Sequence, residues 1–208
     1  MYRIATKSKA FLATAVASLA LMTSGPVLAG PGKPGVNDLA PGGNIVEVAI
    51  AANGALDVFN IVLAAAQCEY FNGAVVDILT GEDKVTLFAP IDQAFVDLDL
   101  GLTAENICDA FNTGAPGALT PTDLLTILAY HVTDGRRFSN SVFNRNNAKE
   151  IEMLAGGSIF TSPDLTISDN QVRGDDPAQL PPIGLVMPYI NINASNGVIH
   201  VIDAVLLP

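Results

Sequence analysis

Histidine and cysteine are the residues of this chain best suited to chemistry, and both are rare. The 208 residues include two histidines, His131 and His200, and two cysteines, Cys68 and Cys108. A zinc site needs a third ligand and a nucleophilic site needs an activated partner, and neither has a local signature here. The sequence also lacks a Gly-x-Ser-x-Gly elbow, a His-Glu-x-x-His motif and a glycine-rich phosphate loop. We therefore expect a protein that is not an enzyme, with no catalytic residue, no metal ion and no cofactor.

The two cysteines predict a disulfide bond. Cys68 and Cys108 lie 40 residues apart, without the short Cys-x-x-Cys spacing of metal and redox sites. In a chain that leaves the reducing cytosol, a bond closing a loop this long stabilises by about 4 kcal/mol in the chain-entropy model. The alternative is two buried free thiols.

The first 43 residues predict export. Residues 1–29 resemble a signal peptide, because basic residues at positions 3, 7 and 9 precede the uncharged run Ala10–Met22. This run is shorter than the ~20 residues of a membrane-spanning helix, although an uncleaved anchor is the alternative. Residues 30–43 contain five glycines and three prolines and predict a flexible linker. We expect a secreted, periplasmic or extracellular protein with no membrane insertion after signal cleavage.

The charge balance excludes one class of partner. Without residues 1–29, the chain has seven Lys and Arg against 21 Asp and Glu, a net charge of −14. Phosphate backbones repel such a surface, so we expect no nucleic-acid partner. Solubility alone explains an acidic surface of this kind.

The last residues predict a strand that is buried on both faces. Asn196-Gly197 favours a hairpin turn with φ > 0, which would pair Pro188–Ile192 with the strand that follows. Beyond the turn, both alternating sets of side chains are mainly apolar, as expected of a covered strand. We expect His200 on this strand to be buried, neutral and hydrogen-bonded, because burial disfavours the charged imidazole.

The first half of the chain predicts helices and one strand. Asn44 is a candidate N-cap, Asn53-Gly54 a candidate stop, and Thr120 caps a helix with Pro121 at its first position. Lys84–Ala89 is rich in β-branched and aromatic residues and predicts a strand. The predicted helical segments are Ile45–Ala52, Leu56–Tyr70, Asp92–Leu98 and a helix from Pro121 to about His131 that ends near Asp134-Gly135.

The second half predicts short strands. Turn residues separate four apolar runs, and Gly174–Gly184 reads as an exposed excursion. The four predicted strands are Glu150–Leu154, Ser158–Thr161, Leu165–Ile167 and Leu185–Ile192. Helices in the first half and strands in the second predict an α+β fold.

Three motifs resemble the fasciclin (FAS1) domain family. The run NGVIHVIDAVLLP at the end of the chain is similar to the second signature box of the family, and VTLFAPIDQAF at 85–95 is similar to the first. Tyr130-His131 matches the tyrosine–histidine motif between them. The resemblance implies one fasciclin domain over residues 44–208, with a β-sandwich wedge and several helices packed on it.

The resemblance also implies a function. Fasciclin domains are linked to cell adhesion, and in the family the tyrosine–histidine motif and a nearby Asp-Ile pair are associated with it. Tyr130 and His131 match, whereas the pair here reads Asn191-Ile192, so the acidic member is missing. We expect adhesion, or extracellular matrix or envelope association, through contacts with an extracellular or envelope protein or a polysaccharide. The alternative is an extracytoplasmic carrier of an apolar small molecule such as a carotenoid.

Some residues of these motifs have simpler interpretations. His131 would lie in the last turn of its helix, where a positive imidazole is favoured and where it can donate to nearby carbonyls in a structural role. Arg173-Gly174-Asp175 would matter only in a protein that meets integrins, and chance explains it nearly as well. Asn193-Ala194-Ser195 is a glycosylation acceptor only in a eukaryotic host.

Overall fold

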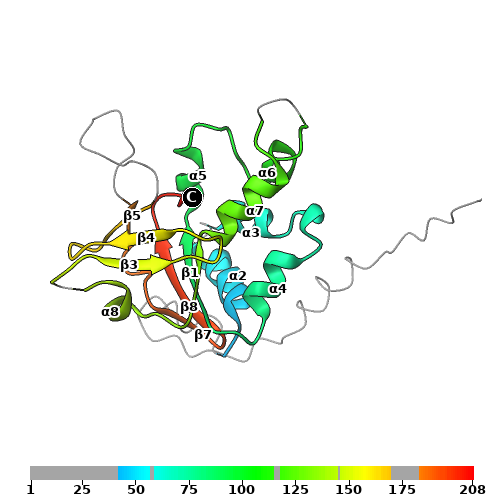
Figure 1. The fold of residues 1–208 in the computed structure, drawn as a ribbon. Coiled ribbons are helices and arrows are strands. Elements are labelled where there is room, and N and C mark those ends of the chain that lie inside the picture. Colours follow the sequence, from blue (N-terminus) through cyan, green and yellow to red (C-terminus); the bar gives the residue numbers. More distant parts are fainter. Residues whose placement is uncertain (1–41, 57–58, 115–117, 145, 170–182) are drawn as a thin grey trace, which may run out of the picture. The chain divides into compact units, whose positions relative to one another are not determined.

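The computed structural model describes residues 42–56, 59–114, 118–144, 146–169 and 183–208. Within these ranges the chain forms two four-stranded sheets and several helices, which confirms the predicted α+β class (Figure 1). The predicted signal peptide, almost all of the predicted linker, and the Arg173-Gly174-Asp175 tripeptide lie outside the described residues. No helix in the described ranges is both long and apolar enough to cross a membrane.

The first sheet has the strand order β2-β1-β8-β7. Its strands are β1 (Val85–Pro90), β2 (Val132–Asp134), β7 (Ile192–Ala194) and β8 (Gly197–Ile202). The two central strands, β1 and β8, pair in parallel, whereas both outer pairs are antiparallel. Every residue of β1 and β8 is buried, which confirms the prediction that the last strand is covered on both faces.

The second sheet is antiparallel throughout, with the order β3-β4-β5-β6. Its strands are β3 (Lys149–Glu152), β4 (Ser158–Thr161), β5 (Thr166–Ser168) and β6 (Ile183–Gly184). Three of the four predicted strands are confirmed to within two residues at each end. The predicted strand Leu185–Ile192 is wrong, because the chain turns around Pro188, which has no N–H for a ladder, and β7 begins only at Ile192.

Helices cover one face of the first sheet. The α-helices are α2 (Ile45–Leu56), α3 (Asn60–Ala66), α4 (Ala74–Thr80), α5 (Asp92–Val96), α6 (Ile107–Ala110), α7 (Pro121–Ala129) and α8 (Ser139–Val142), and η3 (Glu69–Phe71) is a 3-10 turn.

Several helices end at residues other than those predicted. The predicted helix Leu56–Tyr70 is wrong as one element, because α3 ends at Ala66 and a separate 3-10 turn follows. The predicted stop at Asn53-Gly54 is also wrong, because α2 continues to Leu56. The helix after Thr120 ends at Ala129, and the segment expected to finish it, Val132–Asp134, is strand β2. The Thr120 cap is confirmed: its hydroxyl accepts from the Asp123 N–H, and the Asp123 carboxylate accepts from the Thr120 N–H.

The first sheet lies between two apolar cores. One core packs α2, α3, α4 and α7 against side chains such as Leu87 and Ile199. The other packs Phe88 and Ile202, from the opposite face of the same strands, against the inner face of the second sheet. Figure 1 shows this order of layers, with α2 and α4 on one side of β1 and β8 and with β3 and β4 on the other. The predicted disulfide is confirmed, and it joins Cys68 after α3 to Cys108 in α6.

The turn between β7 and β8 is a hairpin of a different kind from the one predicted. Ala194 pairs with Gly197, so Ser195 and Asn196 form the loop, and neither Asn196 nor Gly197 has a positive φ. Glycine is required at position 197 because there is no room for a side chain. A Cβ there would lie 2.2 Å from the Val85 carbonyl oxygen and 2.5 Å from Ile45 Cδ1.

Candidate functional site

The tyrosine–histidine motif lies at the end of α7 and faces inward. Tyr130 is fully buried between the two sheets, and its hydroxyl donates a 2.8 Å hydrogen bond to the Ser158 carbonyl at the start of β4. Because the chain leaves the helix after Ala129, the neighbouring residue His131 points into the other core, below the helices. The two members of the motif therefore reach opposite sides of the first sheet.

His131 is a buried, neutral imidazole with both nitrogens paired. Its Nδ1–H donates to the Ile127 carbonyl at 2.7 Å, and its Nε2 accepts the Leu206 N–H at 2.9 Å. Burial lowers the pKa of His131 from 6.5 to about 4, against the smaller opposing effects of the Ile127 hydrogen bond and Asp169. The expected positive imidazole at the helix end is therefore wrong, because desolvation outweighs the helix dipole. The expected structural role agrees with these contacts.

Asn191 connects the hairpin to the loop before α8. Its backbone is left-handed, with a φ of 57°, a conformation that asparagine tolerates better than most residues. Its Oδ1 accepts the Ser139 N–H at 2.6 Å, and its Nδ2 donates to Ser139 Oγ at 2.8 Å. An amide can make both of these bonds, whereas a carboxylate could only accept. Ile192, the next residue, is buried.

His200 lies on β8 and completes this local network. Its Nε2–H donates to the Arg137 carbonyl at 2.8 Å, and its Nδ1 faces the Asn191 N–H at 3.4 Å. The ring stacks on Phe88, with centroids 5.7 Å apart. Burial lowers the pKa of His200 below its usual value. The prediction of a buried, neutral and hydrogen-bonded His200 is confirmed.

The arrangement limits what the predicted adhesion residues can do. Tyr130, His131 and Ile192 are buried, and Asn191 is half-buried, so they form no continuous surface patch. Their role in adhesion stays a prediction, as does glycosylation of Asn193, which is exposed on β7.

The polar groups that could do chemistry are occupied by backbone partners. All four imidazole nitrogens of the two histidines have such a partner. Among the described residues, no group of three or more His, Cys, Asp or Glu side chains is arranged to hold a metal ion. Both histidines are therefore engaged in contacts within the fold.

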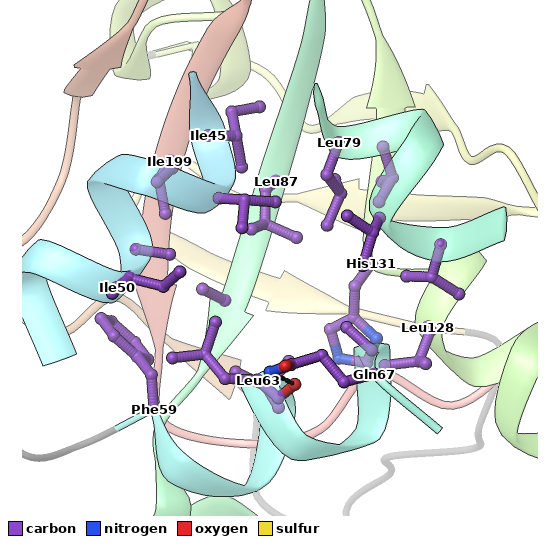
Figure 2. A pocket seen from close by; sticks show the side chains of 18 residues that line it. Ile45, Ile50, Phe59, Leu63, Gln67, Leu79, Leu87, Leu128, His131 and Ile199 are labelled. Carbon is purple, nitrogen blue, oxygen red and sulfur yellow. Dashed lines mark hydrogen bonds between the residues drawn. The ribbon is translucent and has the colours of Figure 1, made fainter. Parts of the chain in front are cut away.

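Sequence reasoning missed an apolar cavity of about 170 Å³ between the helices and the first sheet. Figure 2 shows its side chains arranged around an open centre. The lining comes from α2, α3, α4, α7 and the strands β1, β2 and β8, and Gln67 and His131 are its only polar side chains. The lining residues are Ile45, Val46, Ala49, Ile50, Phe59, Val62, Leu63, Ala66, Gln67, Val75, Val76, Leu79, Leu87, Ala89, Leu128, His131, Val132 and Ile199. A sequence signal existed in α2, where adjacent apolar residues at 45–46 and 49–50 make a stripe wider than one packed face requires.

The comparisons with known proteins agree with this fold. The sequence model of the fasciclin domain matches residues 64–208. "Protein sll1483" of Synechocystis sp. (strain ATCC 27184 / PCC 6803 / Kazusa) is 31% identical over 164 residues, which cover 79% of this chain and 73% of that protein. A solved FAS1 domain pair from the insect cell adhesion molecule Fasciclin I superposes with a TM-score of 0.52 at 16% identity. That match covers 80% of this chain and 51% of the insect chain, so this chain spans about half of it.

Proposed function

The chain belongs to the fasciclin domain family, and we propose that it is a secreted, non-catalytic protein for adhesion or for extracellular matrix or envelope association. Its partner would be an extracellular or envelope protein or a polysaccharide, recognised through surface contacts. The solved relative named above is an insect cell adhesion molecule, which agrees with this role. The disulfide between Cys68 and Cys108 suits an oxidising compartment outside the cytosol.

One observation carries the proposal: side-chain hydrogen bonds hold two surface segments together. Asn191 binds Ser139, His200 binds the Arg137 carbonyl, and Arg136 reaches across to the carbonyls of Ala194 and Ser195. These bonds join two segments, residues 135–140 and 191–195, which we call the adhesion face. Asn191 holds this face directly through Ser139, whereas the rings of Tyr130 and His131 bond to Ser158, Ile127 and Leu206, outside the face.

The exposed side chains of the adhesion face suit a binding surface. Phe138 is 38% exposed although it is large and apolar, and Arg136 is an exposed cation on a strongly acidic chain. Aromatic residues and arginine are the side chains most enriched where protein interfaces bind tightly. A partner of acidic or polar character could contact Arg136 while an apolar group covers Phe138.

The test compares two exposed phenylalanines in an adhesion assay on envelope or matrix material from the native host. Phe138→Ala should reduce retention of the purified protein, because it removes an aromatic contact from the adhesion face. Phe160→Ala is the matched control, because Phe160 is 44% exposed on the outer face of the second sheet. Equal retention of both variants would reject the adhesion face.

A double variant tests the motif itself. Tyr130→Ala/His131→Ala removes both buried rings, so it should lower the free energy of unfolding, and retention should fall to the extent that the variant unfolds or its adhesion face is altered. Measuring urea unfolding beside adhesion separates a misfolded protein from a folded protein with an altered face. Retention equal to that of the wild type would count against any dependence of adhesion on this motif.

A second candidate function rests on the cavity. We propose, as the alternative, an extracytoplasmic carrier of an apolar small molecule such as a carotenoid. A cavity of about 170 Å³ could enclose only part of such a molecule, because pockets for drug-sized ligands measure about 300–1,000 Å³. The test is extraction of the protein purified from its native host: a bound pigment or lipid would support carriage, and protein without extractable apolar cargo would reject it.

A further inference from the structure

The inner wall of the cavity is buried and, apart from His131, apolar. Its side chains include Leu79 of α4, Leu87 of β1 and Leu128 of α7, which converge from three elements (Figure 2). An engineered cavity of about 150 Å³ with an apolar lining in another protein stays dry and binds benzene. A void of about 170 Å³ can therefore hold roughly one ring, or a similar number of carbons in a chain.

The cavity also has an accessible mouth. Six of its 18 lining residues are half-buried or exposed, and they belong to α2, α4 and the segment of α3 with the residue after it. These six residues, which we call the mouth residues, are Val46, Ile50, Val62, Leu63, Gln67 and Val76. Five of the six are aliphatic, and Ile50 is 42% exposed. An aliphatic opening above an apolar void allows a chain to enter without crossing a polar barrier.

The chemistry of the lining defines the head group. None of the 18 residues carries a formal charge, since the imidazole of His131 is neutral and both of its nitrogens are occupied. A carboxylate head at the mouth would lose hydration without gaining a cation, on a chain that is already strongly acidic. Gln67 is exposed and lines the cavity, and its Nε2 donates one hydrogen to the Leu63 carbonyl, which leaves its Oε1 and second amide hydrogen available to a ligand. An amide can donate to and accept from a neutral hydroxyl or ester.

We propose that this cavity binds the end of one neutral aliphatic chain, which enters between α2, α3 and α4 and leaves a hydroxyl or ester head beside Gln67. This inference rests on the second function proposed above, because it names the ligand class that a carrier of this kind would take. It also sets the orientation: the tail occupies the inner wall, and the rest of the molecule projects from the mouth residues.

The experiment uses 1-octanol and octanoate as a matched pair of probes, which share one chain and differ in head-group charge. Both are titrated at neutral pH into the methyl-labelled protein and followed by NMR. Octanol should shift the methyl signals of Leu79, Leu87 and Ile199 in a saturable way, because these side chains line the cavity. The methyl groups of Ile159 and Ile167 lie in the other core and should not move. Octanoate should bind at least about tenfold more weakly, a difference of about 1.4 kcal/mol.

Two leucine substitutions locate the site. Ala66→Leu adds three carbons to the cavity wall and should weaken octanol binding by at least about tenfold, whereas the control Ala74→Leu lies outside the lining on an exposed position of α4. Unshifted Ile159 and Ile167 signals will show that each variant is folded. If Ala66→Leu does not fold, Ala49→Val fills the same cavity from α2.

Each outcome bears on one claim. Absence of saturable shifts with octanol, or shifts that survive the filling substitution, would overturn the site. Equal binding of octanoate would overturn the neutral ligand class. Octanol binding by a protein that carries no apolar cargo from its native host would reject carriage and leave this inference standing, so the two failures are distinguishable.

Discussion

The imidazole Nε2 of His131 accepts a 2.9 Å hydrogen bond from the backbone N–H of Leu206, 75 residues further along the chain. The same ring donates through Nδ1 to the Ile127 carbonyl, so the bond to Leu206 exists only while the ring is neutral. One side chain thus fixes the end of α7 to the segment that follows β8. Protonation would place two N–H donors against each other and charge a buried group.

This geometry predicts an acid-sensitive fold. The pKa of His131 is about 4 in the folded protein and 6.5 for an ordinary histidine, so the unfolded chain binds more protons between these values. The stability that depends on neutral His131 should therefore be fully present above about pH 6.5. The free energy of unfolding should fall as the pH is lowered towards 4, by an amount of the order of 3 kcal/mol. Urea unfolding at a series of pH values measures it.

His131→Asn is the control for this acid sensitivity. Carboxylates and His200 also titrate in the acidic range, but they are present in both proteins and cancel when the two pH profiles are subtracted. Asparagine removes the titrating group and leaves a polar side chain near Ile127. Parallel profiles for the wild type and the variant would show that His131 is not held neutral.

Gly197 tests the close approach of the two central strands. Its partner in the parallel register is Val85, whose carbonyl oxygen would lie 2.2 Å from an added Cβ. Since a backbone atom of a fully buried strand cannot move aside, Gly197→Ala should cost at least about 3 kcal/mol or prevent folding.

A second glycine provides the comparison. At Gly184, the three atoms nearest to an added Cβ belong to the side chain of Asp203, the first at 2.6 Å, and that side chain can rotate away. Gly184→Ala should then cost about 1 kcal/mol, the value of the Asp203 hydrogen bond to the Gly184 N–H. Comparable unfolding midpoints for the two variants would contradict the steric explanation for glycine at position 197.

Local patterns predicted the parts of this fold that depend on local physics. The capped start of α7 follows from Thr120, Pro121 and Asp123, whose side chains act within one helical turn. The burial of His200 follows from apolar residues on both faces of its strand. The turn at Asn196-Gly197 was predicted for the wrong reason. Glycine is required at 197 because a Cβ there would clash with the carbonyl oxygen of Val85, a residue distant in sequence.

The rest depends on contacts between distant segments. The parallel pairing of β1 with β8 joins strands more than a hundred residues apart, and no local pattern specifies that register. The cavity likewise exists only where four helices meet the first sheet, so no single segment contains it. Within Leu185–Ile192, however, Pro188 was a visible reason to doubt a strand, and the apolar pattern was given too much weight.

His200 gives a prediction on the strength of the interior network. His200→Ala removes the stacking on Phe88 and leaves the Arg137 carbonyl without its donor, so we expect a loss of about 1–3 kcal/mol in unfolding free energy. Chemical denaturation measures this loss. A variant as stable as the wild type but without adhesion would make His200 a contact residue and reject its structural role.

Substitution of Asn196 by aspartate tests how much a buried charge would destabilise the fold. This buried amide accepts the Ile45 N–H at 2.9 Å and donates to the carbonyls of Leu79 and Gly81 at 2.8 and 3.0 Å. Asn196→Asp would keep the acceptor but direct a carboxylate at two carbonyl oxygens. At neutral pH this variant should lose at least about 3 kcal/mol, because an uncompensated charge is buried.

The loss should shrink as the pH falls. Burial favours the protonated carboxyl in the folded state, so the pKa of the new group lies above its unfolded value and the native state binds the extra proton. A protonated carboxyl can then donate to one of the two carbonyls. The stability difference from wild type should therefore be largest at neutral pH and smaller near pH 4, whereas Asn112→Asp, the same change at an exposed residue, should show almost no difference. A deficit in Asn196→Asp that does not depend on pH would mean that the lost donor, not the charge, is what the fold cannot accommodate.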